Sequence, residues 1–367
     1  MIIYHTQKYI DRKILCLGKV KILDKQRIGW VCSYTPLELI YAANFLPYRI
    51  EGHSKPIETA DSFIHPNYCQ FVKSAIDNAL DGKYEFLDGV VFVNSCDAMR
   101  RLHDVWKRYV PSKFTYILDL PMGESNLGVK YLKNEFKKFK LSLEKYTNKT
   151  IQEEDLRNGM KIFIESRSLY RKLDSLRTQE PPLISGEEMA GITSQFFKSN
   201  PKVWNEKIKK LIEEKKRTNL IIKKPRILLS GSPIHNIEFI KFVENCGLNV
   251  IYEDLCTGSK FFNLNIKNSA DLYESLAEAY INRIPCARMM KINDRASNIS
   301  ELSHKLNIDG IIYHSLKFCD TYLYDVPRLK ELLKEQDLKV LFIESDGMGS
   351  MNQLKTRIEA FTEIIKQ

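Results

Sequence analysis

Short apolar runs alternate with amphipathic stretches along most of the chain. Residues 89–94 form one such run, GVVFVN, which is apolar and rich in β-branched residues and therefore predicts a buried strand. Ala98, Leu102, Val105 and Trp106 then recur at helical spacing and predict a helix directly after it. Similar runs predict strands at residues 27–31, 48–51, 114–120, 226–230, 248–253, 309–315 and 338–345. Strands that alternate with helices in this way are typical of parallel sheets with helices on both faces.

The predicted strands fall into two groups separated by a long helical stretch. The chain has 367 residues, which is too long for one ordinary core. We predict an α/β domain over residues 1–128, a helical connector over 129–224 and a second α/β domain over 225–367. The two sheets would form Rossmann-like or flavodoxin-like domains that face each other across a cleft. Open α/β sheets bind ligands beyond the carboxyl ends of their strands, so a ligand site is expected in this cleft. No glycine-rich phosphate fingerprint follows a strand, so no nicotinamide site is expected.

Local signals predict where several helices begin and end. Ser95 is a candidate cap for the helix after residue 94, and Thr150 with Glu153 matches the pattern of a capping box. Phe45-Leu46-Pro47 would end the helix predicted after residue 36. Pro181-Pro182 would end the charged helical stretch that precedes these two prolines in the chain. Further helical or arm-like segments are predicted at residues 1–24, 185–216, 271–281 and 353–365.

Composition and charge narrow the class of protein. Apolar residues make up 44% of the chain and charged residues 28%, which is typical of globular domains. There is no run of about 18 apolar residues and no signal-peptide pattern, so we expect no membrane segment and a reducing, cytoplasmic location. The net charge of +10 comes partly from lysine-rich runs without a nucleic-acid motif, so no nucleic-acid partner is expected. A basic surface favours an anionic ligand or an acidic partner.

The eight cysteines are the most informative chemical feature. Six lie in loops at or near predicted helix starts: Cys32, Cys69, Cys96, Cys256, Cys286 and Cys319. We interpret Cys16 and Cys246 as structural, because they sit in apolar or helical contexts. A thiol at a helix N-terminus has its thiolate stabilised, and the thiolate is the form that binds metal. Because the six form no C-x-x-C pair, two interpretations stay open: single ligands that converge on a metal cluster, or scattered buried thiols.

Sequence blocks around these cysteines resemble the 2-hydroxyacyl-CoA dehydratase and benzoyl-CoA reductase family. IGWVCSYTPLELIYAANFLPYRI resembles the opening motif of that family, and PNYCQFVKS, SCDAMRRLHDVW, YEDLCTGSKFF, RIPCARM and HSLKFCD are similar to its later blocks. The resemblance runs from about residue 25 to residue 365 and keeps the order of the blocks. Each block alone is weak, whereas together they are specific.

The resemblance implies an iron–sulfur protein. In the dehydratase subunits of the family, three cysteines hold a [4Fe-4S] cluster. The positions that match them here are Cys32, Cys96 and Cys319. A related branch, the double-cubane cluster proteins, uses six cysteines of one chain to hold two cubanes joined by a sulfide, an [8Fe-9S] cofactor. The resemblance favours this branch. The positions similar to its additional ligands are Cys69, Cys256 and Cys286.

The resemblance also implies partners and a reaction class. Family members receive single electrons from an ATP-hydrolysing [4Fe-4S] activator protein, and they work as homodimers or as heterodimers with a homologous subunit. A double-cubane reductase would act on small unsaturated or nitrogenous molecules. A dehydratase subunit, a lyase, would pass an electron to the thioester carbonyl of a 2-hydroxyacyl-CoA, and the ketyl radical would expel the hydroxyl group. A non-catalytic electron-relay protein is the alternative from another class.

Charged and histidine side chains near the cysteines are expected to have structural and not catalytic roles. Glu38 is expected to cap or pair locally. Arg100 and Arg101 are expected to form surface salt bridges, although they would also neutralise an anionic cluster. None of the loop histidines is singled out as a general acid; they are His53, His65, His235 and His314.

Overall fold

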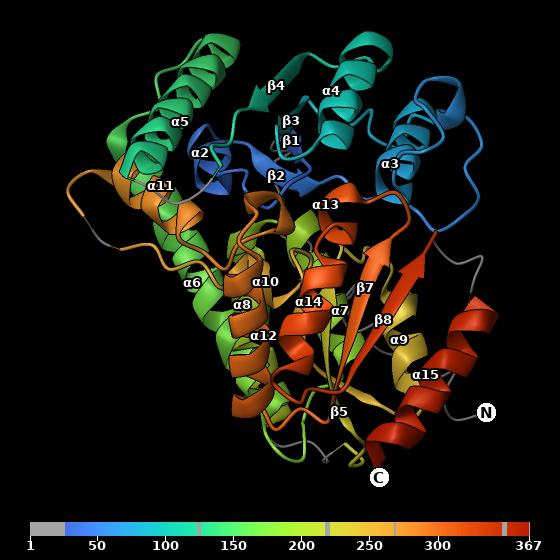
Figure 1. Cartoon of the computed structure of the whole chain (residues 1–367). Helices are drawn as coiled ribbons and strands as arrows, with labels where there is room; N and C mark the ends of the chain where they lie inside the picture. Colours follow the sequence, from blue (N-terminus) through green and yellow to red (C-terminus); the bar gives the residue numbers. More distant parts are fainter. Residues whose placement is uncertain (1–25, 123–125, 217–220, 268, 347–350, 367) are drawn as a thin grey trace.

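Two four-stranded parallel sheets organise the part of the chain that the computed structural model describes, residues 26–122, 126–216, 221–267, 269–346 and 351–366 (Figure 1). The first sheet has the strand order β2-β1-β3-β4, with Arg27–Trp30 (β1), Leu46–Arg49 (β2), Gly89–Val93 (β3) and Phe114–Leu118 (β4). The second has the order β6-β5-β7-β8, with Arg226–Gly231 (β5), Asn249–Asp254 (β6), Gly310–Leu316 (β7) and Val340–Ser345 (β8). The two sheets thus share one connectivity, and the predicted α/β class with two parallel sheets is confirmed.

Helices cover both faces of the first sheet. One face packs on Gln70–Leu80 (α3) and Asp97–Tyr109 (α4), with the short turn Ala60–Ser62 (η1) nearby. The other face shares a core with many helices. They are Leu37–Ala42 (α2), Asn126–Thr147 (α5), Glu153–Thr178 (α6), Gly186–Lys198 (α7), Pro201–Lys215 (α8), Ser259–Phe262 (α10) and Leu272–Ile281 (α11). Because α10 and α11 follow β6 in the chain, the second part of the sequence completes the core of the first sheet.

The second sheet is also covered on both faces. Ile237–Asn245 (α9) and Met351–Lys366 (α15) pack on one face, and Ile292–Lys305 (α12) and Val326–Lys334 (α14) on the other. Two short helices, Ala287–Met289 (η2) and Asp320–Leu323 (α13), lie in its loops. No helix in the described ranges is long and apolar enough to cross a bilayer. The predicted arm at residues 1–24, and Cys16 with it, lies outside the described residues, and the predicted three-part division of the chain stays a prediction.

Two predicted boundaries near prolines and caps are wrong. Leu46 and Pro47 do not end a helix but begin β2, which is an edge strand and therefore tolerates a residue without an N–H group. The capping box of α6 consists of Gln152 and Asp155 and not of Thr150 and Glu153, since the Gln152 backbone N–H donates to the Asp155 carboxylate at 2.9 Å. The box therefore sits two positions further along the chain than predicted.

The helix predicted over residues 185–216 is two helices, α7 and α8. The Asn200 side chain accepts a hydrogen bond from the backbone N–H of Lys202 at 3.0 Å, and Pro201 occupies the first turn of α8. A cap followed by proline starts a new helix, so the break follows from the local sequence. Helices α12 and α14 were not predicted. Each buries only a narrow stripe of residues, and polar and charged residues make up the rest of the helix.

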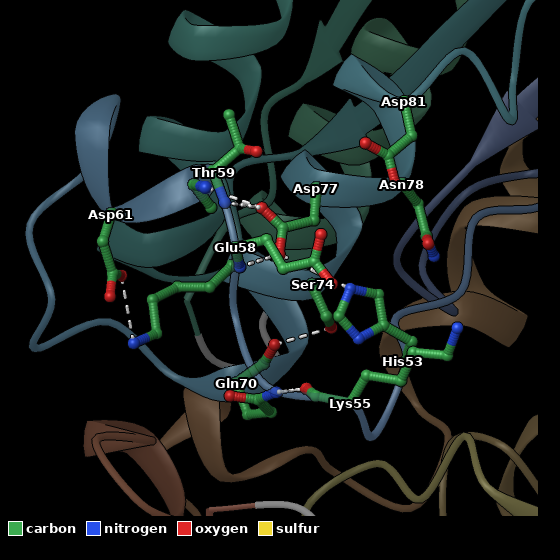
Figure 2. Close-up of polar contacts among 12 residues, drawn as sticks. His53, Lys55, Glu58, Thr59, Asp61, Gln70, Ser74, Asp77, Asn78 and Asp81 are labelled. Atoms are coloured by element: carbon green, nitrogen blue, oxygen red, sulfur yellow. Dashed lines mark hydrogen bonds and ion pairs between the residues drawn. The ribbon is translucent and has the colours of Figure 1, made fainter.

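Asp77 of α3 anchors the loop between β2 and α3, as Figure 2 shows. Its carboxylate accepts hydrogen bonds from the backbone N–H groups of Glu58 (2.9 Å), Thr59 (3.0 Å) and Ala60 (2.6 Å). The Asp77 side chain is only 3% exposed. Hydrogen bonds from backbone N–H groups to a carboxylate are stronger than those to a neutral acceptor, and burial shields them from water. The loop is thereby fixed to α3, the helix that begins directly after Cys69.

We predict that Asp77→Ala lowers the free energy of unfolding by about 2–4 kcal/mol, because it leaves buried amide groups without an acceptor. Asp61→Ala is the matched control: it removes an ion pair to Lys73 at 3.2 Å in which the Asp61 side chain is 46% exposed, and it should cost less than about 1 kcal/mol. Urea unfolding followed by circular dichroism measures both. Equal losses for the two variants would contradict the anchoring role of Asp77.

Candidate cysteine site

The carboxyl ends of the two sheets face each other. In Figure 1 the arrows of β7 and β8 point toward the first sheet. Contacts between the loops confirm the approach: the Nη2 group of Arg288, in η2, donates to the Leu120 carbonyl beyond β4 at 2.6 Å. The Tyr34 hydroxyl, beyond β1, accepts a hydrogen bond from the backbone N–H of Cys286 at 3.5 Å. The site therefore lies where parallel sheets usually bind ligands.

Loops at these facing ends carry the six predicted cysteines. Cys32 follows β1 and Cys256 follows β6, whereas the other four occupy the position directly before a helix, which is α3 for Cys69, α4 for Cys96, η2 for Cys286 and α13 for Cys319. All six are free thiols; Cys69 is buried and the others are partly buried. The predicted cap Ser95 does not cap α4, because Cys96 is the residue before that helix and no side chain caps it.

The thiols interact electrostatically in two groups of three. Thiolate charge on Cys286 and Cys256 acts on Cys32, and thiolate charge on Cys319 and Cys96 acts on Cys69. We call these the Cys32 group (Cys32, Cys256, Cys286) and the Cys69 group (Cys69, Cys96, Cys319). The two groups overlap, because charge on Cys32 and Cys286 acts on Cys96, and charge on Cys286 acts on Cys319. The six predicted cysteines are thus near enough to one another to interact electrostatically.

Burial decides the protonation of these thiols. Burial first, and repulsion from neighbouring thiolates second, raise the pKa of Cys32 to about 11 and the pKa of Cys96 to about 12. The pKa values of Cys69 and Cys319 are raised for the same reasons. Protein groups alone therefore leave these thiols neutral at pH 7. Holding them together as thiolates requires a cation, and soft sulfur donors select thiophilic metals and iron–sulfur clusters.

Among the described residues, no three His, Cys, Asp or Glu side chains lie close enough to bind one metal ion. The irons of a cubane occupy different corners, so its thiolate ligands are spread more widely than the ligands of a single ion. The donor set is all sulfur, which matches the ligands of such clusters. In its chemistry, the site therefore fits a cluster better than a mononuclear metal.

Tyrosine and arginine side chains that the sequence analysis missed surround the thiols. The Tyr322 hydroxyl lies 3.8 Å from the Cys286 sulfur, and burial together with the Cys286 thiolate holds the pKa of Tyr322 well above its usual value. Arg49 directs its Nη2 group to the Cys256 sulfur at 3.8 Å. Tyr322 follows Cys319 by three residues, and this short spacing indicates a tyrosine near the cysteine site. Nothing near Arg49 in the sequence indicates its contact with Cys256, which is 207 positions away.

Glu38 forms a buried ion pair, but with a distant and not a local partner. Its Oε1 atom lies 2.7 Å from Nη2 of Arg167 on α6, and its Oε2 atom accepts a hydrogen bond from the Tyr280 hydroxyl of α11 at 2.9 Å. The expectation of local pairing is therefore wrong. The network connects α2, which begins just beyond the Cys32 loop, to α6 and α11. Its role is therefore to fix the position of α2 next to that loop.

Arg101 forms the surface salt bridge expected of it. Its Nη1 group lies 2.8 Å from Asp104, and its side chain is 47% exposed. Arg100 makes no such bridge in the described residues and donates instead to the side-chain oxygen of Asn94. Neither arginine has a contact with a cysteine sulfur among the interactions of the described residues.

We predict that Glu38→Ala destabilises the protein by about 3–5 kcal/mol, because it leaves Arg167 as a buried charge without a partner. Arg101→Ala, which removes an exposed pair, should cost less than about 1 kcal/mol. Thermal unfolding of the two variants beside the unmodified protein tests the contrast. A Glu38→Ala protein that unfolds at the same temperature as Arg101→Ala would refute the structural role of the pair.

The four loop histidines are held neutral or serve structural contacts. His314 on β7 is buried, its Nε2 atom lies 2.7 Å from the Ser345 hydroxyl, and burial lowers its pKa to about 4. His235 stacks on Phe71 with ring centres 4.4 Å apart, and burial and the charge of Arg49 lower its pKa. The other two make polar contacts: His53 lies 3.5 Å from the Asp77 carboxylate, and His65 Nδ1 accepts a hydrogen bond from the backbone N–H of Asn67.

We predict that His314 makes the protein sensitive to mild acid. Its pKa is lower in the folded state than its ordinary value of 6.5, so the folded protein resists protonation. The stability that neutral His314 contributes is complete above pH 6.5 and is lost as the pH falls toward 4, by about 3 kcal/mol in all. The free energy of unfolding of His314→Gln should therefore decline less than that of the unmodified protein between pH 6.5 and pH 4. Parallel declines for both proteins would contradict the assignment.

The fold is of the α/β class, with two parallel sheets whose carboxyl ends face each other and carry free thiols. The chain belongs to the family of the 2-hydroxyglutaryl-CoA dehydratase D-component, whose model matches residues 32–365. The family resemblance seen in the sequence blocks is thus confirmed, and the chain is a dehydratase-like component of an enzyme.

Named relatives cover nearly the whole chain at low identity. The chain is 25% identical to the (R)-phenyllactyl-CoA dehydratase beta subunit of Clostridium sporogenes, covering 99% of this chain and 96% of that protein. It is 25% identical to one of the benzoyl-CoA reductase subunits of Thauera aromatica, with 98% and 96% covered. It is 23% identical to the beta subunit of (R)-2-hydroxyglutaryl-CoA dehydratase of Acidaminococcus fermentans, with 95% and 94% covered. These relatives are named as subunits of dehydratases and of a reductase.

Proposed function

We propose that the chain is a cytoplasmic iron–sulfur reductase component that receives low-potential electrons from an ATP-hydrolysing activator protein and passes them to a small-molecule substrate. The observation that carries the proposal is the position of the six free thiols, which lie in loops at the facing carboxyl ends of the two sheets. Three thiolates for each of two cubanes is the ligand count of an [8Fe-9S] double-cubane cofactor. When bound, such a cofactor would supply electrons at low potential.

The residues of the chain would hold this cofactor and limit access to it. Thiols just before helices, such as Cys69 and Cys96, would be favoured as thiolates by the helix N-termini once a metal offsets their burial. The Tyr322 hydroxyl would donate a hydrogen bond to the Cys286 sulfur, because its raised pKa keeps it protonated. Hydrogen bonds to ligand sulfurs and exclusion of water are the means by which proteins adjust the potential of such centres.

The names of the relatives favour a second candidate function, the [4Fe-4S] subunit of a heterodimeric 2-hydroxyacyl-CoA dehydratase. Two of the relatives above are named as beta subunits of acyl-CoA dehydratases. In that case one cluster would be held by Cys32, Cys96 and Cys319, a homologous partner subunit would complete the enzyme, and the basic surface of the chain would favour an anionic acyl-CoA substrate. The iron content distinguishes the two functions.

We predict about eight irons per chain, with matching acid-labile sulfide, in protein purified without oxygen. Each of the six cysteines, changed singly to Ala, should lower the iron content, because each provides one ligand. Cys246→Ala is the matched control, since Cys246 is a buried cysteine packed in the core beneath α9 and the second sheet.

The outcome sorts the candidate functions directly. About four irons, lost only on changes at Cys32, Cys96 and Cys319, would replace the double-cubane proposal with the dehydratase subunit. Protein that contains no iron although it was never exposed to oxygen would remove both. A reduction rate that does not depend on added activator and ATP would remove the activator from the proposal while leaving the cofactor in place.

A further inference from the structure

Arg49 carries a buried positive charge directed at one ligand position of the Cys32 group. It is the last residue of β2 and is 1% exposed. Its Nη1 group donates to the Cys256 carbonyl at 2.9 Å, and its Nη2 group lies 3.8 Å from the Cys256 sulfur. The guanidinium thus contacts both the backbone and the sulfur of the same residue, which belongs to the facing sheet.

Two aromatic rings hold the guanidinium in this orientation. The central carbon of Arg49 lies 4.7 Å from the ring centre of Trp30 on β1 and 4.7 Å from the ring centre of Phe197 on α7. Each such cation–π contact is worth about 0.5–2 kcal/mol, and the rings also keep water away from the charge. Because water is excluded, the interaction of the guanidinium with charge at the Cys256 sulfur is screened weakly.

Arg49 differs from the other buried arginines in its partners. Several of these pair with carboxylates or bond two or more carbonyl oxygens: Arg167 with Glu38, Arg177 with Glu253, Arg283 with the Ser33 and Lys260 carbonyls, and Arg226 with the Thr178, Gln179 and Leu306 carbonyls. Arg49 has no carboxylate partner among the described residues, and its buried Nε atom has no hydrogen-bond acceptor there. A buried charge left in this state costs several kcal/mol unless an anion lies beside it.

We propose that Arg49 is the resident counter-charge of the metal group at the Cys32 group and raises its reduction potential through the Cys256 sulfur. This inference rests on the proposed function. An electron added to the metal group increases the negative charge on its sulfur ligands, and a fixed cation next to one of them stabilises the reduced state more than the oxidised state. Arg49 is therefore a positioning residue for electron transfer, and it would contact no substrate.

The test compares Arg49→Gln with Arg49→Lys and with Arg226→Gln. Gln removes the charge and keeps a shorter, polar side chain, whereas Lys keeps the charge and loses the planar fork. Arg226 is the matched control, because it is a buried arginine on β5 that bonds only carbonyl oxygens, at the amino end of the second sheet and so away from the cysteines. Iron content is measured first on each anaerobically purified protein, and a redox titration monitored by EPR then gives the midpoint potential.

Arg49→Gln is expected to keep its iron and to have an equilibrium constant for one-electron reduction at least about tenfold lower, a shift of about 59 mV to more negative potential. Arg49→Lys should retain most of the potential of the unmodified protein, and Arg226→Gln all of it. If Arg49→Gln loses its iron, Arg49→Lys decides: recovery of the iron supports the counter-charge, and equal loss overturns it.

An unchanged potential in an iron-loaded Arg49→Gln protein would also overturn the inference, as would an equal shift in Arg226→Gln. These results differ from failure of the proposed function, which shows as absence of iron in the unmodified protein. The experiment therefore separates the role of Arg49 from the existence of the cofactor.

Discussion

The site depends on one electrostatic constraint: sulfur atoms that share a poorly hydrated space cannot all be anionic unless positive charge lies among them. Burial alone raises the pKa values of Cys32 and Cys96 far above neutrality, and the neighbouring thiolates add to the effect. The protein supplies only part of the compensation, through helix N-termini, backbone N–H groups and the guanidinium of Arg49. The irons of the proposed metal group would supply the remaining positive charge, and the fold around the site keeps the sulfurs together in spite of their repulsion.

Rigid connections between the two sheets provide that restraint. Arg49 reaches from β2 to the loop beyond β6, and Arg288 reaches from η2 to the loop beyond β4. Beneath these loops, α11 packs with α5 in the core of the first sheet although it follows β6 in the chain. Helices from the second part of the chain thus complete the core of the first sheet, and hydrogen bonds between loops join the facing ends of the two sheets.

The sequence predicts the strands well because each is a short apolar run with clear limits, and it predicts the positions of the cysteines beyond them for the same reason. What it could not predict is which thiols are neighbours, since that depends on how one sheet faces the other. Arg49 illustrates the limit: its partner Cys256 is 207 positions away. The Glu38–Arg167 pair, 129 positions apart, escaped prediction in the same way. The wrong capping box and the missed break at Asn200 are different, because local sequence contained both signals.

The composition of the two thiol groups has a mechanical consequence. Cys32 comes from the first sheet, but Cys256 and Cys286 come from the part of the chain that contains the second. Cys69 and Cys96 come from the first, but Cys319, which lies beyond β7 as Cys96 lies beyond β3, comes from the second. Any polynuclear group bound by either set would therefore cross-link the two lobes, in the way that a disulfide joins distant segments. Cofactor insertion would then add a link between the facing ends of the two sheets, besides the core that α10 and α11 complete, and loss of the cofactor would remove that link.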